Sequence, residues 1–208
     1  MRLLPLAACL IAGCMGLGPR PDRTRFFTLA PLGPEEPTAA APALDTSLGL
    51  GPIVFPAYLD RLAIVRRTGA NELAISATDR WGESLRETFR TTLQQNLVAL
   101  LGTPRVVLHP WLRTERPELA VDVEVLRFEP GSNGDADLAA RWHLVRVVDG
   151  SVLVSRTSEI AEPAGASDTD HAVAALSRAL GTLSREIATA VRSEPARGRA
   201  RPPVGAGR

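Results

Sequence analysis

Apolar residues recur every three or four positions along two stretches of the chain, which is the spacing of one helical face. The first stretch predicts a helix over 83–101. Its apolar face is formed by Leu85, Phe89, Leu93 and Leu97. Ser84 and Glu87 fit a capping box at its start, and Gly102 ends it.

The second periodic stretch follows Ser167, which together with Asp170 predicts a capped start for the last helix. Its apolar stripe consists of Val173, Leu176, Leu180, Leu183, Ile187 and Val191. This spacing is also that of a coiled-coil seam. The stripe covers fewer than three heptads, however, which favours a helix that faces a core.

Between these helices, apolar and polar residues alternate, as they do in half-buried strands. Val121, Val123 and Val125, separated by Asp122 and Glu124, are the clearest example. Segments with strand character are 26–29, 48–55, 63–66, 72–76, 105–108, 121–125, 138–144 and 151–159. The pattern predicts a single α+β domain, with a mostly antiparallel sheet of about six strands packed by two main helices.

Proline, glycine and alanine mark the segments that lie outside this pattern. We expect a signal peptide at 1–13, a tether at 14–25 and a folded domain at 26–193. The domain includes a loop rich in proline and alanine at 31–45. The tail at 194–208 is rich in arginine and proline, has no apolar periodicity and is predicted to be disordered.

Both cysteines of the chain lie within its first fourteen residues. Arg2 and the short apolar run behind it are typical of a secretory signal peptide, and the run is shorter than the ~20 apolar residues that span a bilayer. Ile11, Ala12, Gly13 and Cys14 resemble the lipobox of bacterial lipoproteins. That resemblance implies recognition of the first three residues by a signal peptidase, cleavage after Gly13, and fatty acids such as palmitate on Cys14.

A second four-residue match ends at Cys9, but too few apolar residues precede it. The other alternative is an ordinary signal peptide whose cysteines are incidental. Met15 follows the lipobox cysteine, where an aspartate usually favours retention at the inner membrane. The resemblance to this sorting rule implies attachment to the periplasmic face of the outer membrane. Two or more acyl chains hold a protein there stably.

Composition narrows the possible functions. The net charge of +1 argues against a nucleic-acid-binding protein, which usually carries a basic excess. The three histidines, His109, His143 and His171, do not have the spacing of metal ligands. Asp122 and Glu124 form a carboxylate pair, but a solvated strand face explains them. We therefore predict no catalytic residue, no metal site and no cofactor, and we do not expect an enzyme.

Residues 48–85 carry a more specific pattern. It runs through Gly51-Pro52, Pro56, Tyr58-Leu59-Asp60-Arg61, Arg67-Thr68-Gly69, Asn71-Glu72-Leu73 and Asp79-Arg80-Trp81. This stretch resembles the PqiC-type family of ABC-transport auxiliary lipoproteins. The similarity continues loosely over 26–160.

The resemblance implies a non-catalytic outer-membrane lipoprotein of an intermembrane lipid-transport and membrane-integrity system. Such a protein acts as an adaptor for a periplasm-spanning protein with an MCE domain, and it can self-assemble into a homo-oligomer. The alternative is a periplasmic carrier that shelters acyl chains itself, which requires an apolar cavity between sheet and helices. A hydrolase is a third possibility, but the sequence offers no nucleophile with a recognisable base.

Four side chains of the motif combine bulk with a polar end, as interface anchors do: Tyr58, Arg61, Arg80 and Trp81. They are the candidate residues for contact with the partner. A structural role is the alternative. In that case Trp81 fills the core, and Arg61 or Arg80 pairs with a nearby Asp60, Asp79 or Glu83.

Overall fold

The computed structural model describes residues 21–33 and 43–194. The predicted signal peptide and the lipobox at 11–14 lie outside the described residues. So do most of the 31–45 loop and the tail from residue 195 onwards.

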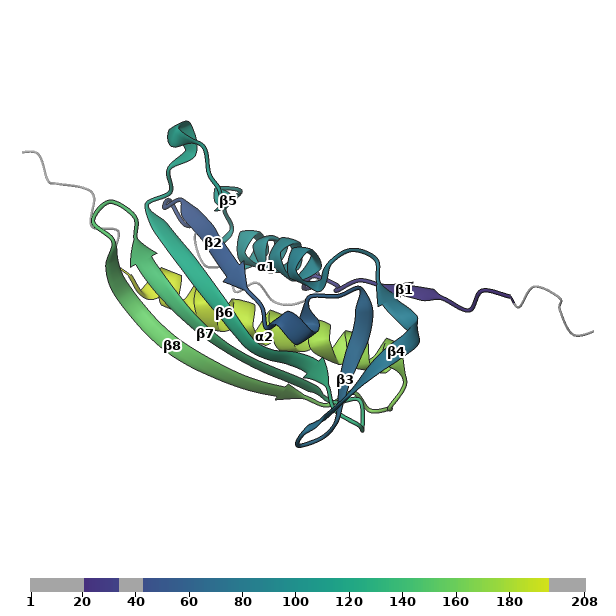
Figure 1. The fold of residues 1–208 in the computed structure, drawn as a ribbon. Helices are drawn as coiled ribbons and strands as arrows, with labels where there is room; N and C mark the ends of the chain where they lie inside the picture. The colour runs from purple at the N-terminus through teal and green to yellow at the C-terminus, as the bar shows by residue number, and fades with distance from the viewer. Residues whose placement is uncertain (1–20, 34–42, 195–208) are drawn as a thin grey trace, which may run out of the picture.

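Eight strands, two α-helices and two short 3₁₀ helices make up the fold (Figure 1). In chain order they are β1 (Arg25–Phe27), β2 (Leu48–Val54), η1 (Ala57–Leu59), β3 (Ala63–Gly69), β4 (Glu72–Trp81), α1 (Leu85–Leu101), β5 (Val106–Leu108), η2 (Arg113–Glu115), β6 (Leu119–Pro130), β7 (Ala136–Arg146), β8 (Ser151–Glu162) and α2 (Thr169–Ser193).

The strands divide between two sheets, a three-stranded sheet of order β1-β4-β3 and a five-stranded sheet of order β5-β2-β6-β7-β8. This arrangement confirms the α+β class. The hairpins β3–β4, β6–β7 and β7–β8 are antiparallel, as the tight turns predict. In contrast, β2 runs parallel to both β5 and β6, because the β3–β4 hairpin and α1 intervene in sequence and carry the chain back to the same end.

Helix α2 crosses one face of the long strands, and α1 lies beside it (Figure 1). The predicted inward face of β7 is confirmed, because Leu138, Ala140, Trp142 and Leu144 are fully buried. The predicted stripe of α2 is buried as well. The indole N–H of Trp142 donates to Ser158, whose hydroxyl donates to the Glu186 carboxylate. Buried side chains of β7 and α2 therefore lie in the layer where the carrier hypothesis requires a cavity.

Capping differs between the two helices. Ser84 caps α1 as predicted and accepts a hydrogen bond from the Glu87 backbone N–H at 3.3 Å. The predicted cap of α2 at Ser167 is wrong by one residue, since the N-cap is Asp168, which accepts from the His171 N–H at 3.0 Å. A carboxylate is favoured there because it is a charged acceptor at the positive end of the helix.

Candidate functional site at the tether junction

Strand β1 is the first regular element of the described chain, and the predicted tether leads directly into it. The strand pairs in parallel with the end of β4, where Arg25 lies opposite Asp79 and Phe27 lies opposite Trp81. The backbone N–H of Gly82 also donates to the Phe27 carbonyl at 2.8 Å. A force applied to a lipid-anchored N-terminus would therefore be transmitted to the domain first through β1 and β4.

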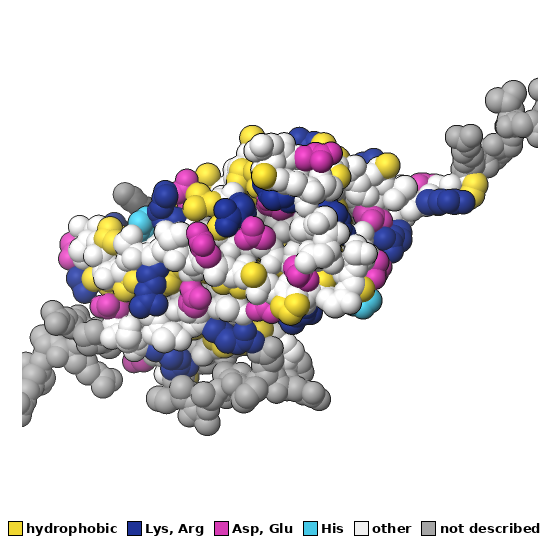
Figure 2. Space-filling view, turned by 90° about the horizontal axis from the view of Figure 1, so that it is seen from below, with side chains coloured by type: hydrophobic (Ala, Val, Ile, Leu, Met, Phe, Trp, Pro, Cys, Tyr) yellow, Lys and Arg dark blue, Asp and Glu magenta, His cyan; other side chains and the backbone are white. Residues whose placement is uncertain are grey.

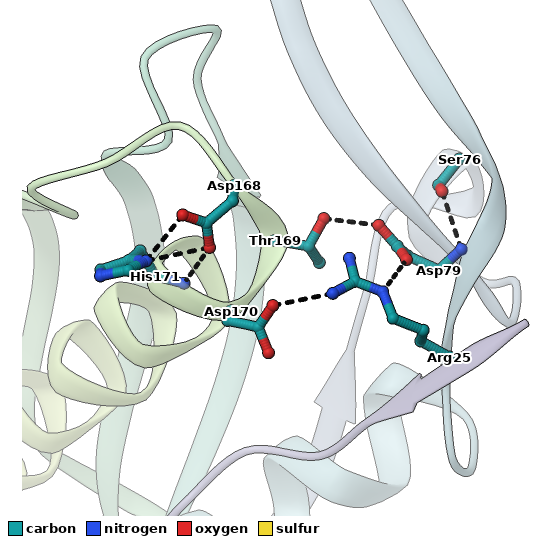
Figure 3. Close-up of polar contacts among 7 residues, drawn as sticks. All are labelled: Arg25, Ser76, Asp79, Asp168, Thr169, Asp170 and His171. Carbon is teal, nitrogen blue, oxygen red and sulfur yellow. Dashed lines mark hydrogen bonds and ion pairs between the residues drawn. The ribbon is translucent and has the colours of Figure 1, made fainter. Parts of the chain in front are cut away.

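Arg25 joins three elements at this junction (Figure 3). Its Nε donates to Asp79 Oδ1 of β4 at 2.9 Å, and its Nη1 donates to Asp170 Oδ2 of α2 at 2.8 Å. A single guanidinium thus binds two carboxylates that are far from it in sequence. This fork geometry is the one that arginine provides and lysine does not.

Asp79 is buried, and both of its carboxylate oxygens accept hydrogen bonds. Thr169, at the start of α2, donates its hydroxyl to Asp79 Oδ2, and the Asp79 backbone N–H donates to Ser76 Oγ at 2.9 Å (Figure 3). Burial raises the pKa of the Asp79 carboxyl, but the hydrogen bonds from Arg25 and Thr169 outweigh it, so this pKa lies below its ordinary value. The junction therefore holds an ionised carboxylate at neutral pH.

The start of α2 carries a second polar contact. Asp168 accepts from the backbone N–H of His171 and also contacts His171 Nδ1 at 2.7 Å through Oδ2 (Figure 3). These hydrogen bonds from His171, the backbone one first, lower the pKa of Asp168. Both groups hold the first turn of α2 at the position where Asp170 meets Arg25.

After β1, the chain continues as an extended strap, residues 28–33, held by side chains of both helices. The Leu32 N–H donates to Asn96 Oδ1 of α1 at 2.8 Å, and the Ala30 N–H donates to Ser177 Oγ of α2 at 3.1 Å. A Cβ on Gly181 would lie 2.6 Å from Leu32 Cδ2, so the glycine makes room for this contact. The strap therefore ties the N-terminal segment to α1 and α2 as well as to β4.

We expect Asp79→Asn to destabilise the fold in a pH-dependent manner. Because the native pKa of Asp79 lies below that of the unfolded chain, its ionised form stabilises the fold at neutral pH, and this contribution is lost as the pH falls below about 4. Urea unfolding should show a large difference in unfolding free energy between wild type and variant at neutral pH, and a smaller one at about pH 3.

The control for this prediction is Asp137→Asn, since Asp137 forms an exposed ion pair with Arg127. That variant should differ little from wild type at either pH, because exposed pairs contribute little. A pH-independent difference for Asp79→Asn would contradict the assigned role of the carboxylate.

A second polar cluster fixes the β3–β4 hairpin to β6. The buried carboxylate of Glu129 accepts from Arg67 Nε at 2.8 Å, from Tyr58 Oη at 2.8 Å and from the Phe128 N–H at 3.0 Å. Burial, and then the neighbouring Glu129, raise the pKa of Tyr58 to about 12. Tyr58 therefore stays protonated and donates to the carboxylate.

The four candidate interface residues fall into two environments. Trp81 is only 3% exposed and belongs to the core, as its structural alternative predicts, and Tyr58 is half-buried against Glu129. Arg61 and Arg80 are exposed, and within the described chain their guanidinium groups make no hydrogen bond or ion pair. Both lie at one end of the hairpin, since Arg80 pairs with Ala63 in register.

The ion pairs proposed for these arginines do not form. Asp79 pairs with Arg25 instead, and Asp60 pairs with Arg86 of α1 at 3.4 Å. The sequence-based prediction missed Arg25 at the tether junction and Glu129 in the cluster that holds the β3–β4 hairpin. Arg25 stands at the boundary between tether and domain, and Glu129 is an acidic residue that ends an apolar strand, but neither position reveals a partner distant in sequence.

Within residues 21–33 and 43–194, no group of three or more histidine, cysteine, aspartate or glutamate side chains could hold a metal ion. Within the same ranges, none of the helices has the length and apolar character needed to cross a bilayer. A surface pocket of about 300 Å³ lies at the end of the long sheet, lined in part by Leu119, Val147 and Leu153.

Two solved structures share the fold over most of their length. Protein XCC0632 from Xanthomonas campestris, of family DUF330, aligns with a TM-score of 0.68 at 20% identity, over 79% of this chain and 93% of that chain. A crystal structure described as an uncharacterized protein aligns with a TM-score of 0.65 at 20% identity, over 81% and 98%. The PelC dodecamer from Paraburkholderia phytofirmans is less similar, with a TM-score of 0.41 at 17% identity over 73% and 94%.

No curated protein matches the chain significantly. The family model of the ABC-type transport auxiliary lipoprotein component matches residues 27–188, which span β1 to α2. This match confirms the resemblance that the motif at 48–85 carries. It places the chain among transport components rather than in a known enzyme family. The chain therefore belongs to the family of ABC-type transport auxiliary lipoprotein components, envelope-associated lipoproteins that serve a transport system.

Proposed function

We propose that this protein is an outer-membrane lipoprotein subunit of an MCE-type intermembrane lipid-transport and envelope-integrity system. In this role it is a non-catalytic adaptor. Cys14 anchors the chain to the periplasmic face of the membrane, and the α+β domain docks the periplasm-spanning MCE-domain protein. Self-assembly into a homo-oligomer belongs to the same proposal.

The observation that carries the proposal is the way in which the N-terminal segment enters the domain. Arg25 binds carboxylates of β4 and α2, and the strap at 28–33 is bonded to α1 and α2. An adaptor must transmit force between its anchor and its partner. The described chain distributes that force over the three-stranded sheet and both helices instead of leaving it on one loop.

The exposed arginines at the hairpin supply the proposed contact surface. Within residues 21–33 and 43–194 the guanidinium groups of Arg61 and Arg80 make no hydrogen bond or ion pair, and arginine is enriched at binding hot spots. Acidic groups on the partner would satisfy them. Trp81 and Tyr58 contribute indirectly, because their buried contacts hold the β3–β4 hairpin in place.

The test is capture of a separately purified periplasmic MCE-domain protein from the same bacterium by the full acylated chain. We expect direct binding that is weakened at least tenfold, roughly 1.4 kcal/mol, by the double variant Arg61→Glu and Arg80→Glu. Arg156→Glu, on exposed β8, is the matched control and should bind as wild type does. Wild-type protein that fails to bind the MCE-domain protein would contradict the adaptor role.

A further inference from the structure

The pocket of about 300 Å³ opens at the end of the five-stranded sheet, between the β7–β8 turn and the segment that leads into β6. Its apolar wall is formed by Pro117, Leu119, Val147, Val148 and Leu153. Val148 is 82% exposed, the largest exposed fraction among the large apolar side chains of residues 21–33 and 43–194. Exposed apolar groups that gather around a concave site mark a place where a ligand or another chain segment binds.

Helix α2 ends at this pocket. Glu194, the first residue after α2, is one of the residues that line it. In Figure 1, α2 ends at the same end of the long sheet as the β7–β8 turn, opposite β1. Residues 195–208 follow Glu194 directly, so this segment, here called the C-terminal segment, leaves the domain at the rim of the pocket.

Charged side chains surround the apolar wall, and the acidic ones are in excess once ion pairs are taken into account. Arg146 is paired with Asp149 at 3.6 Å. Among the described residues, the carboxylates of Glu118 and Glu194 and the guanidinium of Arg116 make no hydrogen bond or ion pair. Two carboxylates and one guanidinium are thus left without a partner, and the rim favours a ligand with positive charge.

The C-terminal segment has the composition that such a pocket favours. It contains four arginines and no acidic residue. Pro202, Pro203 and Val204 place three apolar residues in a row, directly behind Arg201. Prolines restrict a chain before it binds, which lowers the entropic cost of binding. The segment therefore combines an apolar group with neighbouring cations, and the pocket combines an apolar wall with neighbouring carboxylates.

We propose that this pocket is the docking site for the chain's own C-terminal segment. Residues 202–204 contact the apolar wall, and the preceding arginines lie beside Glu118 and Glu194. The contact covers Val148. The inference uses neither the acylation of Cys14 nor the arginines of the β3–β4 hairpin, so it is independent of the proposed function.

The length of the segment permits this contact. Val204 follows Glu194 by ten positions, and a random coil of ten residues has an r.m.s. end-to-end distance of about 16–19 Å. A group attached so close to its binding site has a local concentration in the millimolar range. Even a weak contact within the chain is then formed for much of the time.

The charge distribution elsewhere on the domain supports recognition at a local site. The side of the domain seen in Figure 2 shows acidic and basic side chains in small, alternating groups, with no broad field of one sign. General attraction to that side would not hold a segment with four arginines. The combination of unpaired carboxylates with an apolar wall is what distinguishes the pocket.

The test measures the binding of a fluorescein-labelled peptide of residues 195–208 by fluorescence anisotropy in a non-ionic detergent. The peptide is titrated with the full chain and with a shortened chain that ends at Glu194. We expect the shortened chain to bind at least about tenfold more tightly, because in the full chain the attached segment already occupies the pocket.

Two controls separate recognition by the pocket from general attraction. Val148→Ser in the shortened chain should weaken binding several-fold, because it removes apolar surface from the pocket wall. Val54→Ser is the matched variant, since Val54 of β2 is also exposed but does not line the pocket, and it should leave binding unchanged. A peptide with the same residues in scrambled order should bind several-fold more weakly.

Equal affinity of the peptide for the full and the shortened chain would overturn docking of the chain's own segment. Equal binding of the scrambled peptide would also overturn it, because charge alone would then explain the contact. If the full chain is a dimer in analytical ultracentrifugation and the shortened chain a monomer, the segment binds a second copy, which contradicts the assignment to the same chain. The adaptor role is tested separately, by binding of the MCE-domain protein.

Discussion

Replacement of Cys14 by serine is expected to remove acylation and release the chain from the membrane fraction. A hydroxyl does not replace the thiol that accepts the diacylglyceryl group, so the lipid that stabilises membrane attachment by ~0.8 kcal/mol per buried CH₂ is lost. Fractionation of cells that express wild-type and Cys14→Ser chains should move the protein from the membrane pellet to the soluble periplasmic extract.

Cys9→Ser is the matched control for this experiment. Cys9 belongs to the competing four-residue match and lies in the segment that processing at Gly13 would remove. That variant should stay in the membrane fraction with unchanged acylation. The opposite pattern, with release by Cys9→Ser only, would move the attachment site to the first cysteine.

The second large effect is expected at the buried cluster that holds the hairpin. Arg67→Met should lower the unfolding free energy by about 3 kcal/mol, because it leaves the charge of Glu129 buried beside Tyr58 with its ion pair removed. Methionine keeps much of the side-chain volume, so the loss of charge dominates. Urea unfolding measures this difference directly.

Arg141→Met provides the comparison for that variant. Arg141 forms an ion pair with Glu124 in which both side chains are about half exposed, and such pairs contribute ~0–1 kcal/mol. Equal losses for Arg67→Met and Arg141→Met would show that burial of Glu129 does not govern the stability of the cluster.

Local patterns in the sequence predicted the helices and strands that bury one face against the core. In strand β7 the residues expected to be inside, such as Trp142, are fully buried. Helix α1 begins at the expected cap and ends at Gly102, which has the left-handed backbone (φ 64°) that glycine adopts easily. For these segments the spacing of apolar residues and the residue at the end of the element are enough to predict the element. Both signals depend only on residues that are close in sequence.

The junction required information that no local pattern contains. Arg25 meets Asp79 and Asp170, which are 54 and 145 residues away in sequence. Asp170 fitted the role of a helix-capping partner equally well, and the ion pair appears only when β1 and α2 are brought together. The parallel pairing of β1 with β4 was hidden for the same reason, since three residues carry too little alternation to reveal a partner.

The interface residues show how a family motif combines two roles. Trp81 and Tyr58 serve the fold, whereas Arg61 and Arg80 remain available at the surface. A sequence motif does not separate these roles, because both kinds of residue lie in the same short segment. The exposed fraction of each side chain in the folded structure distinguishes the two roles.

The intact mass of the chain purified from its own membranes tests the central claim most directly. The account predicts an amino terminus at Cys14 that carries a diacylglyceryl group and fatty acid. An unmodified amino terminus located beyond residue 14 would contradict it, because the domain would then have no covalent attachment to the bilayer.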